Sequence, residues 1–187
     1  MNVLVLGGAA SGKSAFAEKT ACARAKTCGS PLVYLATLNP NAGGDTEERI
    51  ARHRKMRAEK GFATVEWWNC EDAAACGTCK PVVLLEDMGN LVANFLYPPG
   101  KPPRQTGAWT GSRDVVDAAV DELIGMMQKI ASQCTDFVCV SNEIMLGGEL
   151  PEGVRLYGEV LAALNARWAT MCDEVHAVVA GIPQQIK

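Results

Sequence analysis

Residues 7–14 have the composition and spacing of a phosphate-binding loop. They fit the pattern G-x-x-x-x-G-K-[ST], which ends here in Lys13 and Ser14. The glycines let the backbone curl so that successive N–H groups point at phosphate oxygens, and the lysine reaches the terminal phosphates. A glycine-rich turn that only permits close packing would need neither the lysine nor the hydroxyl. The pattern therefore predicts binding of GTP or ATP, with the Ser14 hydroxyl on Mg²⁺.

Two acidic residues are candidates for a second side chain at that metal ion. Residues 81–85 form an apolar, strand-like run, and Glu86 and Asp87 follow it directly. In P-loop enzymes an acid at the end of such a strand orients Mg²⁺ or water. We assign this role to Glu86, with Asp87 as a competitor. A solvated loop acid is the alternative for either residue.

His53 lies in a basic stretch, residues 49–57. If this stretch is helical, Arg49, His53 and Arg57 recur every four residues and share one face. Positive charge nearby disfavours the protonated imidazole, so His53 would keep a nucleophilic nitrogen beside guanidinium groups suited to phosphate. The pattern indicates a side chain that attacks or holds a phosphate; a solvent-facing charged helix is the alternative. The other histidine, His176, is interpreted as a packed or edge residue.

Alternating strands and helices must bring these candidates together. The predicted strands are 3–6, 32–36, 63–67, 81–85, 137–140 and, last in the chain, 175–180; the predicted helices are 13–26, 45–60, 115–132 and 154–172. This order predicts a three-layer α/β architecture with a mostly parallel central sheet. With the phosphate loop it indicates a P-loop NTPase-like (RecA-like) fold, in one domain over residues 1–187. The proline-rich residues 97–113 are predicted to be a long loop, mobile by default.

Composition and charge limit the partners. The chain has 187 residues, 48% of them hydrophobic and 21% charged, which is typical of a globular protein with one core. The net charge of −3 provides no basic surface for nucleic acid, so a small-molecule partner is expected. The sequence contains no apolar run long enough for a membrane span and no secretory signal pattern, which predicts a cytoplasmic protein.

The eight cysteines are expected to be reduced thiols rather than a disulfide framework. Cys70, Cys76 and Cys79 form the one suggestive group. A zinc or iron–sulfur site would need about four ligands, and a second Cys-x-x-Cys is missing from the sequence. We therefore interpret this group as part of a surface turn.

Taken together, these motifs resemble the bifunctional adenosylcobinamide kinase/adenosylcobinamide-phosphate guanylyltransferase family of cobalamin biosynthesis. The resemblance covers nearly the whole chain, and the segment around His53 and the end of the chain are more specific than the phosphate loop. The similar segments are residues 3–14, 34–37, 49–54, 84–86, 92–94, 141–143, 151–152, 164–167 and 180–183.

The resemblance implies two reactions on adenosylcobinamide. A nucleotide γ-phosphate is transferred to its aminopropanol hydroxyl, and GMP from GTP is then transferred to that phosphate, giving adenosylcobinamide-GDP while pyrophosphate leaves. His53 would attack the α-phosphorus and carry GMP as a phosphoramidate, which splits one hard substitution into two easier ones. The basic neighbours would neutralise charge on the transferring group. The family also implies a cytoplasmic homotrimer.

The nucleotide contacts implied by the resemblance follow the motifs above. They are Gly7, Gly8, Ala9, Ala10, Ser11, Gly12, Lys13, Ser14, Ala36, Thr37, Leu38, Arg54, Lys55, Met56, Arg57, Glu66 and Glu86. The chain departs from the family at Ala10, where an arginine is frequent, so one phosphate contact is missing. Residues 144–148 replace a shorter turn, and residues 70–79 and 97–113 look expanded.

Two other functions stay open at this point. The chain could be a P-loop kinase of another small molecule, in which His53 only binds phosphate. It could also be a non-catalytic module that binds GTP without releasing diphosphate or pyrophosphate. The presence of Lys13, Ser14, His53 and Glu86 together favours an enzyme.

Overall fold

A central β-sheet organises the structure, a computed structural model that describes residues 1–39, 51, 57, 60–67, 80–104, 112–144 and 149–187. Within these residues, seven strands form one sheet in the order β3-β2-β4-β5-β1-β6-β7. The strands are β1 (Asn2–Gly7), β2 (Leu32–Ala36), β3 (Ala63–Glu66), β4 (Val82–Glu86), β5 (Asp136–Asn142), β6 (Glu174–Val179) and β7 (Ile182–Gln185). The helices are α1 (Lys13–Cys28), α3 (Met88–Leu96), α4 (Arg113–Ala131) and α5 (Glu152–Met171).

The sheet is mostly parallel, as the sequence predicts. Every pairing from β3 through to β6 is parallel, and only β6 with β7 is antiparallel. The prediction that residues 175–180 form the last strand was wrong, because β7 follows them. A tight turn of Ala180 (φ 50°) and Gly181 (φ 80°) joins the two strands, and two residues with positive φ give the backbone twist that such hairpins require.

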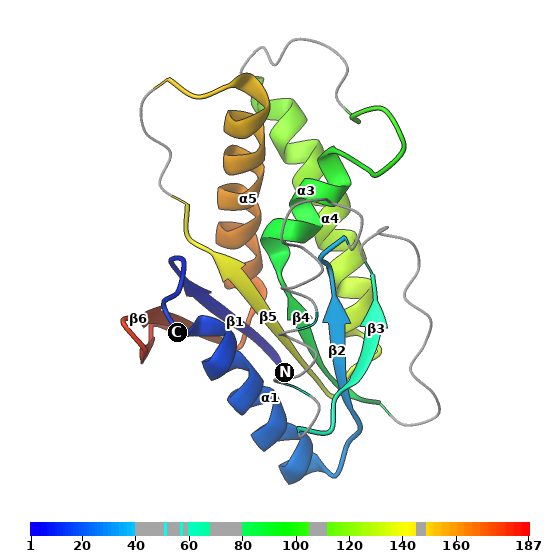
Figure 1. Ribbon diagram of the computed structural model, residues 1–187, viewed down its shortest axis with the longest axis vertical. Helices are drawn as coiled ribbons and strands as arrows, with labels where there is room; N and C mark the ends of the chain where they lie inside the picture. Colours follow the sequence, from blue (N-terminus) through cyan, green and yellow to red (C-terminus); the bar gives the residue numbers. More distant parts are fainter. Residues whose placement is uncertain (40–50, 52–56, 58–59, 68–79, 105–111, 145–148) are drawn as a thin grey trace.

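Helices cover both faces of the sheet, so the architecture has the predicted three layers (Figure 1). Helix α1 packs on one face against Val3 and Val5, and its alanines, such as Ala17, let the helix approach closely. Helices α3, α4 and α5 cover the other face, where Leu4 and Trp168 belong to the larger core. Successive residues of β1 thus enter opposite cores, because side chains alternate along a strand and parallel sheets are buried on both faces.

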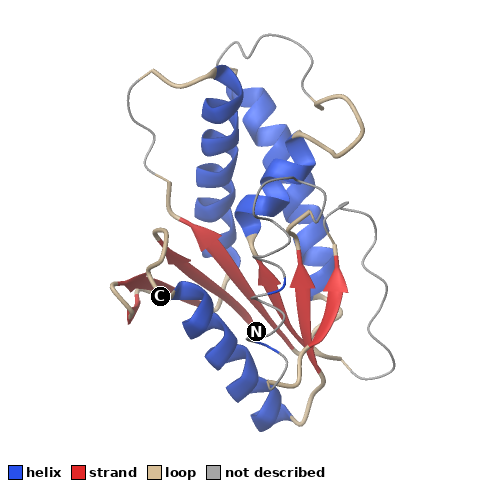
Figure 2. Ribbon diagram, viewed as in Figure 1, coloured by secondary structure: helices blue, strands red, loops and turns tan. Residues whose placement is uncertain are grey.

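Helices α1, α4 and α5 begin and end within a few residues of the predicted positions. Figure 2 shows helices on both faces of the sheet. Helix α3 is not among the helices predicted above; it contains residues 92–94, one of the segments that resemble the family. The predicted helix 45–60 lies outside the described residues except at 51, 57 and 60. None of the described helices is long and apolar enough to cross a membrane.

The first part of the predicted loop at 97–113 packs against the protein. The Arg104 backbone N–H donates to the Leu96 carbonyl (2.9 Å), and the Arg104 guanidinium lies 4.0 Å from the centroid of the Phe95 ring. Arg104 also pairs with Glu122 of α4 at 3.1 Å. Residues 105–111 of this loop lie outside the described part of the chain.

The carboxyl ends of the parallel strands meet at one edge of the sheet. Gly7 of β1 is paired with Asn142 of β5, and Ala36 of β2 is paired with both Glu66 of β3 and Glu86 of β4. All five residues end their strands. Ligands of open α/β sheets bind at this edge, and it is where the sequence-predicted phosphate loop begins.

Candidate functional site

The phosphate loop lies between β1 and α1, as predicted, and its shape requires glycine at positions 7 and 12. Gly12 has a φ of +90°, a conformation that disfavours side chains. A Cβ atom on Gly7 would lie 2.4 Å from the Ser11 Oγ and 2.7 Å from the Val178 carbonyl oxygen. Ala10 also has a positive φ, 55°. Glycine at positions 7 and 12 therefore allows the backbone of this loop to curl tightly.

Contacts from several elements fix this loop. The Lys13 ammonium donates to the Gly8 carbonyl (3.0 Å). The Gly181 N–H, in the β6–β7 turn, donates to the Ser11 carbonyl (2.8 Å), and the Glu143 N–H donates to the Gly7 carbonyl (3.2 Å). The Ser11 hydroxyl is buried, and no described residue gives it a hydrogen-bond partner. The loop is thus pre-organised, with Lys13 folded over it.

Glu86 and Ser14 form the part of the site suited to a metal ion. The Glu86 side chain is buried, and its Oε2 atom has no hydrogen-bond partner among the described residues. Burial raises the pKa of the Glu86 carboxyl, and hydrogen bonding to the Ser14 hydroxyl is the largest influence that lowers it. Buried polar atoms are normally satisfied, and Mg²⁺ prefers oxygen ligands. The orphaned carboxylate oxygen beside a serine hydroxyl therefore fits Mg²⁺.

Asp87, the competitor for this role, is already engaged. Its Oδ1 atom accepts from the Asn90 backbone N–H (2.6 Å), which caps the start of α3. Its Oδ2 atom accepts from the Asn142 side-chain amide (3.2 Å). These contacts favour Glu86 as the acid left free for a ligand.

Arg57 brings a buried positive charge to the same edge. Only 5% of the residue is exposed, and its guanidinium carbon lies 3.3 Å from the centroid of the Tyr34 ring. Its Nε and Nη1 atoms are buried, and nothing in the described part of the chain accepts a hydrogen bond from them. Buried N–H groups without an acceptor are costly. Free guanidinium N–H groups in this setting fit an anionic ligand such as a phosphate.

The segment after β2 is tied to β4 and α3. The Thr37 hydroxyl donates to the Asp87 carbonyl (2.8 Å), and the Asn94 amide donates to the Thr37 carbonyl (2.7 Å). Thr37 is fully buried, whereas Leu38 is half-buried. Thr37 thus contributes to the site by joining neighbouring strand ends. Glu66 is exposed at the end of β3.

The candidate nucleophile is not among the residues whose positions are given. His53, Arg54, Lys55 and Met56 lie outside the described residues, as does Arg49. Two described residues that follow them contact the site: Arg57, as above, and Lys60, which forms an ion pair with the buried Glu18 carboxylate of α1.

Tyr34, Glu18 and Lys60 were not predicted as site residues. Glu18 lies one helical turn after Ser14, which is the one local signal for it. Nothing in the sequence indicates that Lys60 would reach it. Tyr34 lies in an apolar strand, and the only sequence signal for it is the similarity of residues 34–37 to the family.

His176, Cys139 and Cys172 are packed against other parts of the protein. The His176 ring lies 5.0 Å from the Phe16 ring, centroid to centroid, and its Nε2 atom lies 3.3 Å from a Glu174 carboxylate oxygen. Cys139 and Cys172 are buried free thiols. Over the described ranges, no group of three His, Cys, Asp or Glu side chains could hold a metal ion. Cys70, Cys76 and Cys79 lie outside those ranges.

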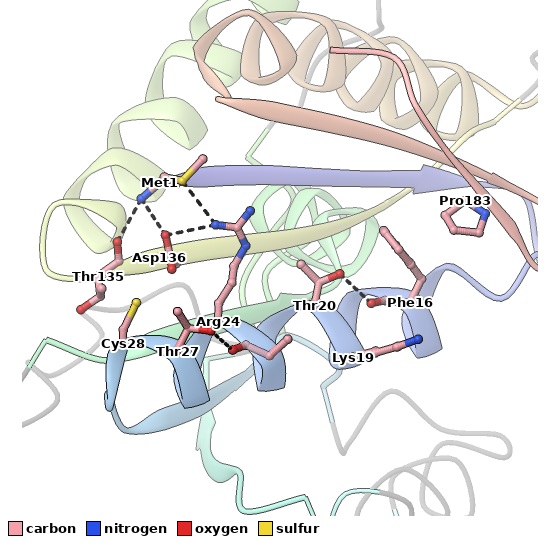
Figure 3. Close-up of a pocket in the computed structure, with 11 residues that line it drawn as sticks. Met1, Phe16, Lys19, Thr20, Arg24, Thr27, Cys28, Thr135, Asp136 and Pro183 are labelled. Carbon is pink, nitrogen blue, oxygen red and sulfur yellow. Dashed lines mark hydrogen bonds and ion pairs between the residues drawn. The ribbon is translucent and has the colours of Figure 1, made fainter.

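A cavity of about 640 Å³ opens beside α1 (Figure 3). Three of its charged groups pair with one another: the N-terminal ammonium lies 2.9 Å from Asp136, and Arg24 lies 3.6 Å from Asp136. Arg24 also lies 2.7 Å from Glu174. None of the sequence-predicted site residues lines it. We therefore place the candidate nucleotide site at the carboxyl edge of the sheet.

Comparison with known proteins finds relatives over the full chain. The family model described as cobinamide kinase / cobinamide phosphate guanyltransferase matches residues 3–186. The chain is 32% identical over 193 residues to the bifunctional adenosylcobalamin biosynthesis protein CobU of Escherichia coli (strain K12), covering 100% of both chains. It is also 32% identical over 197 residues to the bifunctional adenosylcobalamin biosynthesis protein CobP of Pseudomonas aeruginosa, covering 100% of this chain and 98% of the relative.

Among solved structures, the flagellar accessory protein FlaH from Methanocaldococcus jannaschii is similar in fold. Its TM-score is 0.52 at 12% identity, and the match covers 100% of this chain and 77% of the other. At this identity the likeness concerns the fold alone. The predicted P-loop NTPase-like (RecA-like) fold is confirmed.

Proposed function

The chain belongs to the cobinamide kinase / cobinamide phosphate guanyltransferase family, and from this premise we propose that it phosphorylates adenosylcobinamide and then attaches GMP to the new phosphate. The observation that carries the proposal is the match over residues 3–186, because it includes every motif of the site. We further propose that one nucleotide site, built on the phosphate loop within a single domain, serves both reactions.

In the first reaction, the aminopropanol hydroxyl oxygen of adenosylcobinamide attacks the γ-phosphorus of a nucleoside triphosphate. The bond between the γ-phosphorus and the β–γ bridging oxygen breaks, the nucleoside diphosphate leaves, and the hydroxyl proton is released. Lys13 and the loop N–H groups hold the phosphates, and Arg57 directs its free N–H groups at them. Ser14 and Glu86 would hold Mg²⁺, which when bound neutralises phosphate charge.

In the second reaction, an imidazole nitrogen of His53 attacks the α-phosphorus of GTP and pyrophosphate leaves. A phosphate oxygen of adenosylcobinamide phosphate then attacks the same phosphorus, which breaks the P–N bond and frees His53. The role of His53 rests on the family resemblance. The structure supports this role indirectly. Arg57, four residues further along the chain, is buried at the carboxyl edge of the sheet and has free N–H groups.

The proposal includes a homotrimer in the cytoplasm, which also rests on the family resemblance. Light scattering of the purified protein tests the trimer, since it measures molar mass directly. A monomer with both activities would remove the trimer from the proposal and leave the chemistry intact.

Two forms of radiolabelled GTP test the proposed reactions. With adenosylcobinamide present, the γ-label should enter the corrinoid in the first reaction, and the α-label should follow it in the second. Lys13→Ala should lose both transfers, whereas Lys19→Ala, an exposed lysine on the same helix, is the matched control. A corrinoid without either label would contradict the proposal and leave a kinase of another substrate or a GTP-binding module.

A further inference from the structure

Tyr34 is buried between two groups of opposite charge. It lies on β2 with 4% of its surface exposed. The Arg57 guanidinium lies on its ring face, 3.3 Å from the centroid. Burial raises the pKa of the Tyr34 hydroxyl, and the charge of Glu86 is the next largest influence that raises it. The Tyr34 side chain therefore lies between the buried cation and the buried acid of the site.

Arg57 and Glu86 do not satisfy each other, although they are neighbours. Arg57 is close enough to lower the pKa of the Glu86 carboxyl. Yet Glu86 Oε2 and Arg57 Nε and Nη1 are all buried without a hydrogen-bond partner in the described part of the chain. No ion pair joins the two groups in the described part of the chain; the guanidinium lies instead over the Tyr34 ring, with two of its nitrogen atoms left without an acceptor.

The ring of Tyr34 is the contact that orients the guanidinium. A guanidinium that stacks on an aromatic face is held by cation–π attraction through its plane, while its N–H donors, which lie in that plane, stay free. The ring itself is fixed by Phe62, which packs edge-on against it with centroids 5.9 Å apart and an interplanar angle of 86°. The arrangement fixes the plane of the cation and leaves its donors for a ligand.

We propose that Tyr34 is a positioning residue, which holds Arg57 by stacking so that the guanidinium offers its free N–H edge to the phosphates of a bound nucleoside triphosphate. The inference rests on the proposed function, because it assumes that GTP binds at this edge. It adds a residue outside the predicted nucleotide contacts, which began at Ala36 in this segment. Tyr34 acts through Arg57 and does not touch the ligand.

A double-mutant cycle on GTP affinity tests this role. Isothermal titration with GTP and Mg²⁺, without corrinoid, is performed on the wild type, Tyr34→Leu, Arg57→Met and the double variant. Loss of the stack should weaken GTP binding about 5- to 20-fold, the range that cation–π energies in partly desolvated sites give. In the Arg57→Met background, Tyr34→Leu should cause less than about a twofold further loss, because residues acting as a unit are not additive.

Tyr34→Phe separates stacking from the hydroxyl. It keeps the aromatic face, so it should bind GTP much more tightly than Tyr34→Leu, within about a factor of two of the wild type. Tyr97→Leu, at an exposed tyrosine on another element, controls for loss of an aromatic side chain. Thermal unfolding without ligand identifies variants that do not fold; if Tyr34→Leu is one, Tyr34→Met replaces it in the cycle.

The outcomes separate this inference from the function on which it rests. Failure of the wild type to bind GTP would contradict the proposed function. If the wild type binds, an equal loss from Tyr34→Leu with and without Arg57 would overturn the inference, since the role would then be structural. Unchanged affinity in Tyr34→Leu, or a loss in Tyr34→Phe as large as in Tyr34→Leu, would overturn it as well.

Discussion

The Lys60 ammonium forms an ion pair with the carboxylate of Glu18, which is buried on α1 one turn after Ser14. Lys60 follows the basic stretch that contains His53 and Arg57. The pair therefore joins the end of that stretch to the helix that begins at the phosphate loop. A link of this kind couples the position of the predicted transferase residue to the position of the nucleotide.

Removing Lys60 should destabilise the protein more than the exposure of the Lys60 side chain suggests. Lys60→Met leaves the buried Glu18 carboxylate without its partner, and breaking partly buried pairs costs about 1–3 kcal/mol, less than the 3–5 of fully buried ones. Denaturant unfolding measures this cost, with the exposed Lys26→Met on α1 as the control. Equal stability of the two variants would mean that the pair contributes nothing.

Two neighbouring glycines of the phosphate loop should respond differently to substitution. Gly7→Ala places a Cβ atom 2.4 Å from Ser11 Oγ and 2.7 Å from a backbone oxygen, so the loop must shift; a loss of about 1–3 kcal/mol in unfolding free energy is expected. A Cβ on Gly8 meets nothing within 4 Å. Gly8→Ala should therefore keep wild-type stability. Unfolding in urea measures the stability of both variants. A reversed order would show that the loop has another shape.

Glu86→Gln should weaken the response to Mg²⁺. The substitution keeps the shape of the side chain but removes the charge of the oxygen proposed to bind the metal, and a loss of at least about tenfold in kinase rate is expected at limiting Mg²⁺. A Mg²⁺ titration of γ-phosphate transfer measures it. Glu143→Gln, at an exposed acid just after β5, is the control. An unchanged titration curve in Glu86→Gln would remove Glu86 from the metal site.

The contact between Arg24 and Glu174 should make stability depend on pH in the acid range. Hydrogen bonding to Arg24 lowers the pKa of the Glu174 carboxyl below its ordinary value of 4.5. A lowered pKa in the folded state contributes stability above the unfolded value, and that contribution is lost as pH falls through the folded value. Because both side chains are still partly exposed to solvent, the pair is worth about 1 kcal/mol.

Comparing the wild type with Glu174→Gln from pH 7 to pH 3 checks this sign. The difference in unfolding free energy should stay constant above about pH 5 and shrink below pH 4.5, as Glu174 becomes protonated. Glu149→Gln is the matched control at an exposed position. A difference that grows on acidification would mean that Arg24 does not stabilise the carboxylate.

Local patterns in the sequence predicted most of the fold. The apolar run before Gly7 and the spacing up to Ser14 specify a strand, a loop and a helix without reference to the rest of the chain. Strand β7 was missed because all four of its residues are exposed, so its sequence shows no alternation. It exists through its pairing with β6, and that pairing depends on the turn at Ala180 and Gly181.

The candidate site was less predictable because its contacts join distant segments. The sequence predicted Glu86 with Asp87 as a competitor, and what distinguishes the two acids in the structure is Asn142, which reaches Asp87 from another strand. The stacking of Arg57 on Tyr34 depends likewise on how two segments meet. Patterns along the chain identify which residue types could bind phosphate, but not which of their atoms are left free.

The proposed function requires that the chain carries GMP covalently on His53 between the two halves of the second reaction. The direct test is the intact-protein mass after incubation with GTP and Mg²⁺, measured at neutral pH and again after mild acid, for the wild type and His53→Ala. We expect a mass increase of one GMP in the wild type, its loss in acid, and no increase in His53→Ala. A wild type that gains no mass, or a His53→Ala variant that gains the same mass, would contradict it.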